Sequence, residues 1–275
     1  MKVALVQLTS SDDPGHNLST ARAMIDRAVK EGATFVLTPE VTNCLSSSRD
    51  HQRDVLASED EDIVLSGLRE TARSHGIWLL IGSLALKISG QEKFANRSIL
   101  IGPDGDITAR YDKIHMFDVD VSATETYRES DGYAAGDRAV LADGPGAKVG
   151  MAVCYDLRFP GLFRDLAQAG ADILTVPAAF SHETGPAHWE PLLRARAIET
   201  GCYVLAPAQT GRHSASRGRE RQTHGHSMVV DPWGQVVADG GTETGIVFAD
   251  IDLAEVAKAR RRIPSLSQEV PYKQP

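Results

Sequence analysis

The sequence predicts an α/β protein built on mixed β-sheets. Apolar stretches typical of buried strands alternate along the 275 residues with segments whose apolar residues recur at the helical period. Two pairs of stretches are joined by the turn sequences PDGD and DPWG, and these pairs predict antiparallel hairpins. Alternating strands and helices interrupted by hairpins favour a mixed sheet over a purely parallel one. If two such sheets stack face to face, helices would cover each of them from outside.

Composition favours a protein that acts on a small molecule. The hydrophobic fraction of 42% and the charged fraction of 24% are ordinary for a soluble globular protein, and the net charge of −8 argues against a nucleic-acid partner. Cys44, Cys154 and Cys202 include no CxxC pair, so they predict neither a disulfide framework nor a zinc site. No apolar run is long enough for a secretion signal or a membrane span. We therefore expect a cytoplasmic protein with no membrane partner.

The first half of the chain is predicted to hold five strands and two helices. Asn17 is expected to cap the first helix, and Ser58 with Glu61 forms a capping-box signature for the second. A glycine ends each helix, as is common at helix C-termini. The predicted strands cover 3–8, 34–40, 77–86, 94–101 and 107–113, and the helices lie between residues 17 and 32 and between residues 58 and 76.

The second half begins with a predicted long loop. Residues 118–146 carry scattered acids and glycines, and a loop of this length inside a compact domain is either disordered or functional. Strands and helices then alternate again. The predicted strands cover 148–154, 171–180, 202–208 and 245–251, the second hairpin covers 224–239, and the helices cover 162–170, 187–201 and 252–262.

Three reactive side chains follow predicted strands. Glu40, Lys113 and Cys154 each lie at the end of a strand, where α/β proteins bind their ligands. A free thiol has a pKa of about 8.5, so a nucleophilic cysteine needs a base or a cation beside it. The glutamate would supply the base, and the lysine ammonium would favour the thiolate, if the fold brings the three together. Taken alone, the cysteine is more simply a small buried hydrophobe and the glutamate a solvated surface group.

Several segments together resemble one enzyme superfamily. TPE around Glu40, YDKIHMFD around Lys113 and VCYDLRFP around Cys154 are similar, in this order, to the signature segments of the carbon–nitrogen hydrolase (nitrilase) superfamily. TGPAHWEPLLRARAIETGCYV, AQTGRH and GHSMVVDPWG most resemble the amidase branch that contains deaminated glutathione amidase and the omega-amidases. The resemblance implies a single hydrolase domain over residues 1–275. It also implies a four-layer αββα sandwich, in which two stacked mixed sheets are flanked by helices.

The same resemblance implies the chemistry. Glu40 would be the general base, Lys113 the oxyanion partner and Cys154 the nucleophile of a Glu/Lys/Cys triad. Glu129, in YRES, would be a second glutamate that either acts in catalysis or only positions the lysine. The reaction would hydrolyse a small linear amide, such as deaminated glutathione or a dicarboxylic omega-amide, to a carboxylate and ammonia through a thioester. The backbone N–H of Tyr155 would help to bind the oxyanion. The resemblance implies no cofactor and no metal, and a homodimer.

Residues near the nucleophile and after strand ends are expected to bind the substrate. These are Tyr155, Arg158, Phe180 and Thr184. The segment 211–224 is rich in arginine, which suits carboxylate recognition but is also typical of a solvated surface loop. Its arginines are Arg212, Arg217, Arg219 and Arg221.

Other interpretations stay open. The same triad would also serve the hydrolysis of a nitrile or an N-carbamoyl group, and a catalytically silent relative would serve as a binding subunit. His224 and His226 are two residues apart, so on a strand their side chains would point to the same side and could both bind a metal ion. No third ligand has a recognisable spacing. His115, two residues past Lys113, is more simply a packing or hydrogen-bonding neighbour than a base.

Overall fold

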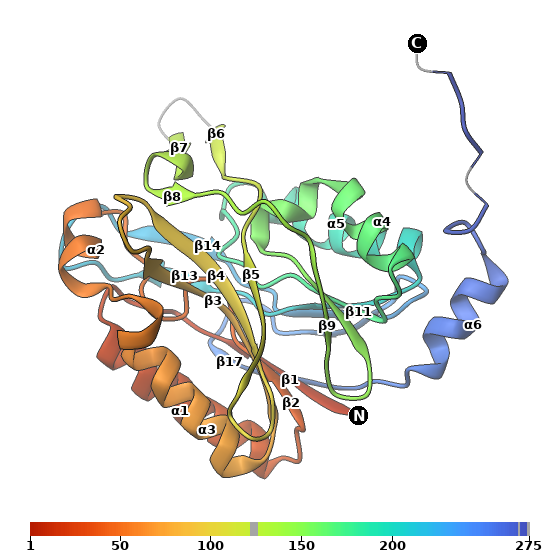
Figure 1. Cartoon of the computed structure of the whole chain (residues 1–275), viewed down its shortest axis with the longest axis horizontal. Coiled ribbons are helices and arrows are strands. Elements are labelled where there is room, and N and C mark those ends of the chain that lie inside the picture. Colours follow the sequence, from red (N-terminus) through yellow and green to blue (C-terminus); the bar gives the residue numbers. More distant parts are fainter. Residues whose placement is uncertain (122–125, 269, 274–275) are drawn as a thin grey trace.

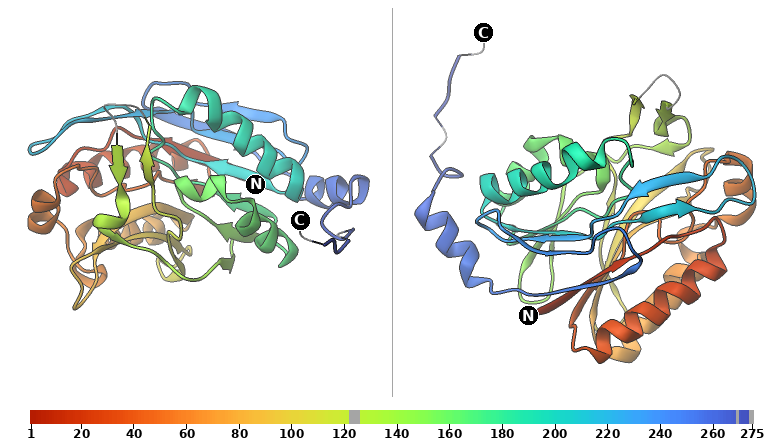
Figure 2. Two further views of the ribbon diagram at one scale, coloured as in Figure 1. Left: turned by 90° about the horizontal axis from the view of Figure 1, so that it is seen from above. Right: turned by 180° about the vertical axis from the view of Figure 1, so that it is seen from behind.

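Two large β-sheets stack face to face and helices cover the outer face of each, as a computed structural model shows (Figure 1). The structure describes residues 1–121, 126–268 and 270–273. The views from above and behind show the four layers, helix, sheet, sheet and helix (Figure 2). The predicted four-layer arrangement of two mixed sheets is therefore confirmed.

The first sheet has seven strands. Strands β1, β2 and β3 run parallel to one another, and the remaining pairs are antiparallel except that β8 runs parallel to β4. Its order is β17 (Gly245–Asp250), β1 (Lys2–Gln7), β2 (Phe35–Leu37), β3 (Trp78–Lys87), β4 (Phe94–Ile101) and β5 (Ile107–Asp112), with β8 (Tyr133–Ala134) beside β4.

The second sheet has six strands and repeats this plan. Strands β10, β11 and β12 are parallel, and antiparallel strands flank them on both sides. Its order is β16 (Val236–Asp239), β15 (Met228–Val230), β12 (Tyr203–Ala206), β11 (Ile173–Thr175), β10 (Lys148–Met151) and β9 (Val140–Asp143). Two small ribbons pair β6 (Asp118–Asp120) with β7 (Thr126–Arg128) and β13 (Thr210–His213) with β14 (Arg221–His224).

Helices pack on the outer faces of the sheets. Helices α1 and α3 cover the first sheet, and α4 and α5 cover the second. The helices are α1 (Pro14–Lys30), α2 (Arg49–Val55), α3 (Ile63–His75), α4 (Pro160–Gln168), α5 (Gly185–Thr200) and α6 (Ala254–Arg262). Short 3₁₀ turns occupy η1 (Glu59–Glu61), η2 (Glu129–Asp131) and η3 (Cys154–Arg158). Across the described residues, no helix combines the length and apolarity needed to cross a bilayer.

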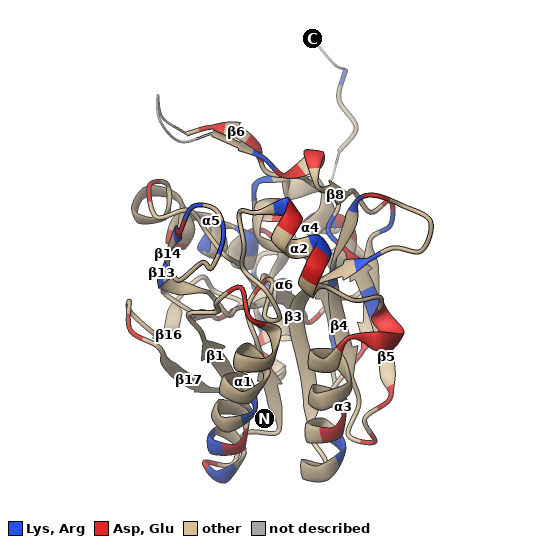
Figure 3. Ribbon diagram, turned by 90° about the vertical axis from the view of Figure 1, so that its left-hand side faces the viewer, with Lys and Arg blue, Asp and Glu red and all other residues tan. Residues whose placement is uncertain are grey.

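Alternation along the strands explains the layers. In β1, Val3 and Leu5 join the core between the two sheets, whereas Ala4 and Val6 pack with α1 and α3 on the other side. Successive side chains of a strand point to opposite faces, so a continuous apolar run is buried on both. Lys, Arg, Asp and Glu lie mainly on helices and loops around the strands (Figure 3). The apolar runs of the sequence thus become the shared core of the sandwich.

Two predicted helix caps were wrong. Helix α1 begins at Pro14, and the Asp13 carboxylate accepts hydrogen bonds from the N–H groups of Gly15 and His16. Proline suits the first helical position because its missing N–H would have no partner there. Asn17 instead lies inside α1. Helix α3 is capped by Asp62, so the signature at residues 58–61 forms η1 before it.

The predicted long loop at 118–146 was also wrong in part. It contains β6, β7, η2 and β8, and β9 completes the edge of the second sheet by pairing with β10. These strands are short and polar on one side, so their sequence lacks the apolar alternation that marks a strand. Residues 122–125, which belong to the same predicted loop, lie outside the described residues.

Candidate active site

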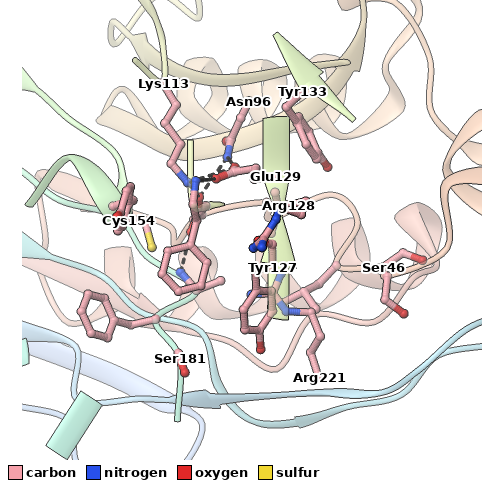
Figure 4. Close-up of a pocket in the computed structure, with 18 of the residues that line it drawn as sticks. Ser46, Asn96, Lys113, Tyr127, Arg128, Glu129, Tyr133, Cys154, Ser181 and Arg221 are labelled. Carbon is pink, nitrogen blue, oxygen red and sulfur yellow. Dashed lines mark hydrogen bonds and ion pairs between the residues drawn. The ribbon is translucent and has the colours of Figure 1, made fainter. Parts of the chain in front are cut away.

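The side chains of Glu40, Lys113 and Cys154 meet in one cavity. They follow β2, β5 and β10, which belong to the two stacked sheets, so the cavity forms where the ends of strands from both sheets converge. Its volume is about 310 Å³. Figure 4 shows Lys113, Asn96 and Glu129 pointing toward one another on one side, with Cys154 beside them. Residues far apart in sequence thus form one cluster.

Lys113 is held between two carboxylates. Its side chain is only 2% exposed, and Nζ donates to Oε1 of Glu40 at 3.0 Å and to Oε1 and Oε2 of Glu129 at 2.9 and 2.7 Å. Burial alone would lower the pKa of this lysine, but the charges of Glu129 and Glu40 outweigh burial and raise the pKa well above its usual value. The lysine is therefore an ammonium ion at neutral pH.

Glu40 is a buried and fully hydrogen-bonded carboxylate. Oε1 accepts from Lys113 and from Nδ2 of Asn96 at 2.9 Å, and Oε2 accepts from the backbone N–H of Ala179 at 2.8 Å. Burial would raise the pKa of this carboxyl. The Lys113 charge, the nearby Cys154 side chain and the Ala179 N–H lower the pKa below its usual value instead. An ionised carboxylate that lines the same cavity as a thiol is suited to act as its base.

Cys154 rests as a thiol. It is 8% exposed, its φ is +49°, and its N–H donates to the carbonyl of Pro177 at 2.9 Å. Burial and the Glu40 charge raise the pKa of the thiol well above its usual value, although Lys113 acts in the opposite direction. Lys113 thus favours the thiolate, as expected, but burial and the Glu40 charge outweigh its effect. The proton must leave through a base during the reaction.

Asp156 supports the turn that carries the cysteine. Its buried carboxylate accepts from the backbone N–H of Val153 at 2.8 Å, from the Tyr111 hydroxyl at 2.7 Å and from the N–H of His115 at 3.0 Å. Nδ1 of His115 also lies 2.7 Å from this carboxylate. A left-handed φ at a non-glycine residue is strained, and such strain persists only where the surroundings hold it. His115 is accordingly a hydrogen-bonding neighbour, as expected.

Asn96 is a site residue that the sequence did not reveal. It lies on β4, 2% exposed, and Nδ2 donates to Oε1 of both Glu40 and Glu129, at 2.9 and 3.2 Å. Its Oδ1 is buried without a hydrogen-bond partner among the described residues. A polar residue in the apolar stretch FANRSILI was the available signal. It gains meaning only when both glutamates are seen beside it.

The expected substrate-binding residues divide into two groups. Tyr155, Phe180 and Thr184 line the cavity. Arg158 does not line it: its guanidinium lies 5.4 Å from the centre of the Phe180 ring and 5.9 Å from that of Tyr155. The aromatic side chains thus separate Arg158 from the space it was expected to reach.

The four arginines of the segment 211–224 also fall into two groups. Arg219 and Arg221 line the cavity. Arg212 and Arg217 instead form surface ion pairs with Glu220, at 3.4 Å, and with Asp54, at 2.7 Å. The two ends of the segment pair as the strands β13 and β14, and residues 214–220, which include Arg217 and Arg219, form the loop between them. Two further arginines, which the sequence analysis did not single out, line the cavity from other elements: Arg49 of α2 and Arg128 of β7.

Neither Cys44 nor Cys202 is placed to act as a nucleophile. Cys44 lines the cavity, but burial and the charge of Asp12 raise the pKa of its thiol to about 12. Cys202 is fully buried under α6, where Arg260 contacts its sulfur. Within the described residues no cluster of three or more His, Cys, Asp or Glu is arranged to hold a metal ion. His226 pairs with Asp239 at 3.0 Å instead.

Comparisons with known proteins agree in sequence and in fold. The family described as Carbon-nitrogen hydrolase matches residues 2–261. A deaminated glutathione amidase of Yersinia enterocolitica is 40% identical over 266 residues, which cover 96% of this chain and 91% of that protein.

Solved structures extend the likeness to the fold. The Caenorhabditis elegans NitFhit protein has a TM-score of 0.89 and 38% identity, covering 98% of this chain and 64% of that one. Saccharomyces cerevisiae Nit3, a member of branch 10 of the nitrilase superfamily, has a TM-score of 0.86 and 31% identity, covering 98% and 96%.

Proposed function

Since this chain belongs to the carbon–nitrogen hydrolase family, we propose that it hydrolyses a small linear amide through a thioester on Cys154. One observation carries the proposal: the buried Cys154 thiol lines the same cavity as the Glu40 carboxylate, and the Lys113 ammonium lies 3.0 Å from that carboxylate. A base, a cation and a nucleophile are the groups that acyl transfer requires. We propose that residues 1–275 form a single hydrolase domain.

The reaction starts with proton transfer from the thiol. Glu40 takes the proton of Cys154 as the sulfur attacks the amide carbon. The tetrahedral oxyanion forms beside the Lys113 ammonium and the backbone N–H of Tyr155. A donor of this kind contributes about 3 kcal/mol, because the charge that it binds appears only in the transition state.

The intermediate then collapses and is hydrolysed. Glu40 gives its proton to the departing nitrogen, which leaves as ammonia from a primary amide or as an amine from a peptide-like amide. Glu40 next activates a water molecule, which attacks the thioester and releases the carboxylic acid product and the free thiol. No step needs a redox change, because bonds to carbon are exchanged and its oxidation state stays the same.

Glu129 is proposed to position the lysine. It accepts two hydrogen bonds from Lys113 and one from the backbone N–H of Phe117, at 2.7 Å. The second carboxylate keeps the lysine charged and aimed, while Glu40 stays available to the thiol. Tyr155, Phe180 and Thr184 are proposed to contact the substrate, since they line the same cavity.

The proposed substrate is deaminated glutathione or a similar dicarboxylic omega-amide. The Yersinia relative is named for the former, and the lining of the cavity includes Arg49, Arg128, Arg219 and Arg221, which suit carboxylates.

Replacing Cys154 with alanine tests the reaction. We expect amine or ammonia release from deaminated glutathione, 2-oxoglutaramate and succinamate to fall to below about one thousandth, because the thioester cannot form.

The matched control for this test is Cys202→Ala, which removes another buried thiol far from the cavity. It should keep its activity, and circular dichroism should show both variants folded. Near-normal turnover by Cys154→Ala would refute the proposed nucleophile.

We also propose that the enzyme is a cytoplasmic homodimer. Its three cysteines are free thiols, which suits a reducing compartment. The exposed apolar side chains of Ile198 and Trp233, with Ile263 at the end of α6, support pairing through the outer layer. Ile198 and Trp233 are 55% and 42% exposed, and Ile198 lies against Gly234.

A further inference from the structure

The cavity carries more positive charge than the triad uses. Lys113 is neutralised by Glu40 and Glu129, and Arg128 pairs with Asp120 at 2.8 Å. Three guanidinium groups in the lining form no ion pair within the described residues. These are Arg49, Arg219 and Arg221. Unpaired cations around a cavity favour an anionic ligand.

Arg221 is the most specific of the three. It lies on β14, with its guanidinium 5.4 Å from the centre of the Tyr127 ring. Its Nε is buried and has no hydrogen-bond partner in the part of the chain that the structure describes. A buried donor without an acceptor is unfavourable, and a guanidinium fork matches a carboxylate with two parallel hydrogen bonds. A carboxylate is the ligand that meets both the charge and the unused donor.

The position of Arg221 is remote from the reacting groups. Figure 4 shows it across the cavity from Lys113. A second hollow of about 260 Å³ shares Tyr127, Arg219 and Arg221 with the catalytic cavity, so these residues lie where the space continues toward the surface. An amide carbon at Cys154 therefore places the opposite end of an extended substrate beside the two arginines.

We propose that Arg221, assisted by Arg219, forms a subsite for a carboxylate remote from the scissile amide. The subsite selects extended, peptide-like amides that end in a carboxylate over short or neutral ones. This inference rests on the proposed function, because it concerns the substrate of the same cavity. Arg217 belongs to the same hairpin, but its ion pair with Asp54 keeps it outside the subsite.

Steady-state kinetics test the subsite with a modified substrate and with a variant of the protein. The wild type is given deaminated glutathione and the methyl ester of its glycine carboxylate. Esterification should raise KM by about 10- to 100-fold, the range expected for a charged hydrogen bond. Arg221→Gln should raise KM for the acid by a similar factor and change KM for the ester by less than about twofold.

Arg217→Gln is the matched control and should leave both substrates unaffected. Equal losses on acid and ester in Arg221→Gln would overturn the subsite, as would a wild type that hydrolyses the ester as well as the acid.

Calorimetric titration separates the subsite from the reaction. In Cys154→Ala no thioester forms, so binding is measured without turnover. Deaminated glutathione should bind to Cys154→Ala about 10- to 100-fold more tightly than its methyl ester does. In the double variant that also carries Arg221→Gln, this difference in affinity should disappear. If the wild type releases no amine while this preference persists, the proposed reaction fails and the subsite stands. If the acid does not bind, or binds no better than the ester, the subsite is refuted.

Discussion

Single residues in this cavity set the protonation states on which the reaction depends. The Glu40 carboxylate stays ionised although it is buried, because the Lys113 charge and the hydrogen bonds from Lys113 and the Ala179 N–H lower its pKa. Asn96 also donates to this carboxylate, at 2.9 Å. The same carboxylate raises the pKa of Cys154. The resting site is therefore a carboxylate, an ammonium and a thiol. This favours attack that is concerted with proton transfer to Glu40 over attack by a thiolate formed in advance.

Asn96 is expected to set the acid limb of the pH profile. Asn96→Leu removes a donor to the Glu40 carboxylate, so the pKa of Glu40 rises. Glu40 works as a base above its pKa, and activity is lost as pH falls through that pKa. The loss should therefore begin at a higher pH than in the wild type. The measurement is kcat/KM against pH.

Asn43→Leu is the control for this prediction. This variant removes a buried asparagine that donates hydrogen bonds to Asp62 and to the Ala85 carbonyl. It should lower the free energy of unfolding without changing the pH at which activity is lost on the acid side. A folded Asn96→Leu protein with an unchanged acid limb would show that Asn96 does not tune Glu40.

At the scale of elements, β3 holds the turn that carries Glu40. The N–H of Ser83 donates to the Pro39 carbonyl at 3.2 Å, and the N–H of Val41 donates to the Ser83 hydroxyl at 2.8 Å. A Cβ on Gly82 would clash with the carbonyls of Thr38 and Pro39. It would also meet Pro177, whose carbonyl accepts from the Cys154 N–H. Gly82 therefore packs between the backbone that carries Glu40, the proposed base, and Pro177, which bonds the backbone of Cys154, the proposed nucleophile.

Gly82→Ala should damage the site more than its size suggests. The added methyl group forces the residue 38–40 backbone away from β3, and we expect a loss of about 1–3 kcal/mol in the free energy of unfolding. The shift of Glu40 should lower kcat about 100-fold, since an error of about 1 Å in a reacting group has that effect. Urea unfolding and steady-state kinetics measure the two quantities.

Gly161→Ala is a suitable comparison, because a Cβ at Gly161 in α4 meets no atom within 4 Å. It should leave both quantities near the wild-type values. Unchanged kinetics in Gly82→Ala would contradict the role of this contact.

At the scale of the whole molecule, the stacking of two sheets creates the site, and the outer layer offers a surface for pairing. The Arg262 guanidinium lies 3.9 Å from the centre of the Trp233 ring, which links α6 to the turn between β15 and β16 beside Ile198. The exposed apolar side chains of α5 and of this turn thus lie together, next to the end of α6. Such patches on monomeric proteins are usually small, and larger ones mark interfaces.

Ile198→Glu should therefore weaken the proposed dimer. A charge in an apolar interface loses its hydration, so we expect the mass measured by light scattering to shift from two chains toward one at micromolar concentration. Ile63→Glu, an equally exposed isoleucine on α3, is the control that should leave the mass unchanged. A wild type that elutes as a monomer would refute the proposed pairing.

The sequence by itself determined the alternation of strands and helices, the two hairpins, the family and the strand-end positions of Glu40, Lys113 and Cys154. These follow from local patterns, because periodicity and turn residues act over a few neighbours. The tertiary structure alone decided that Asn96 joins the two glutamates and that Arg158 lies outside the cavity. It also decided that Cys154 rests as a thiol. Charges, burial and hydrogen bonds act through space between residues distant along the chain, so only the folded arrangement sets them.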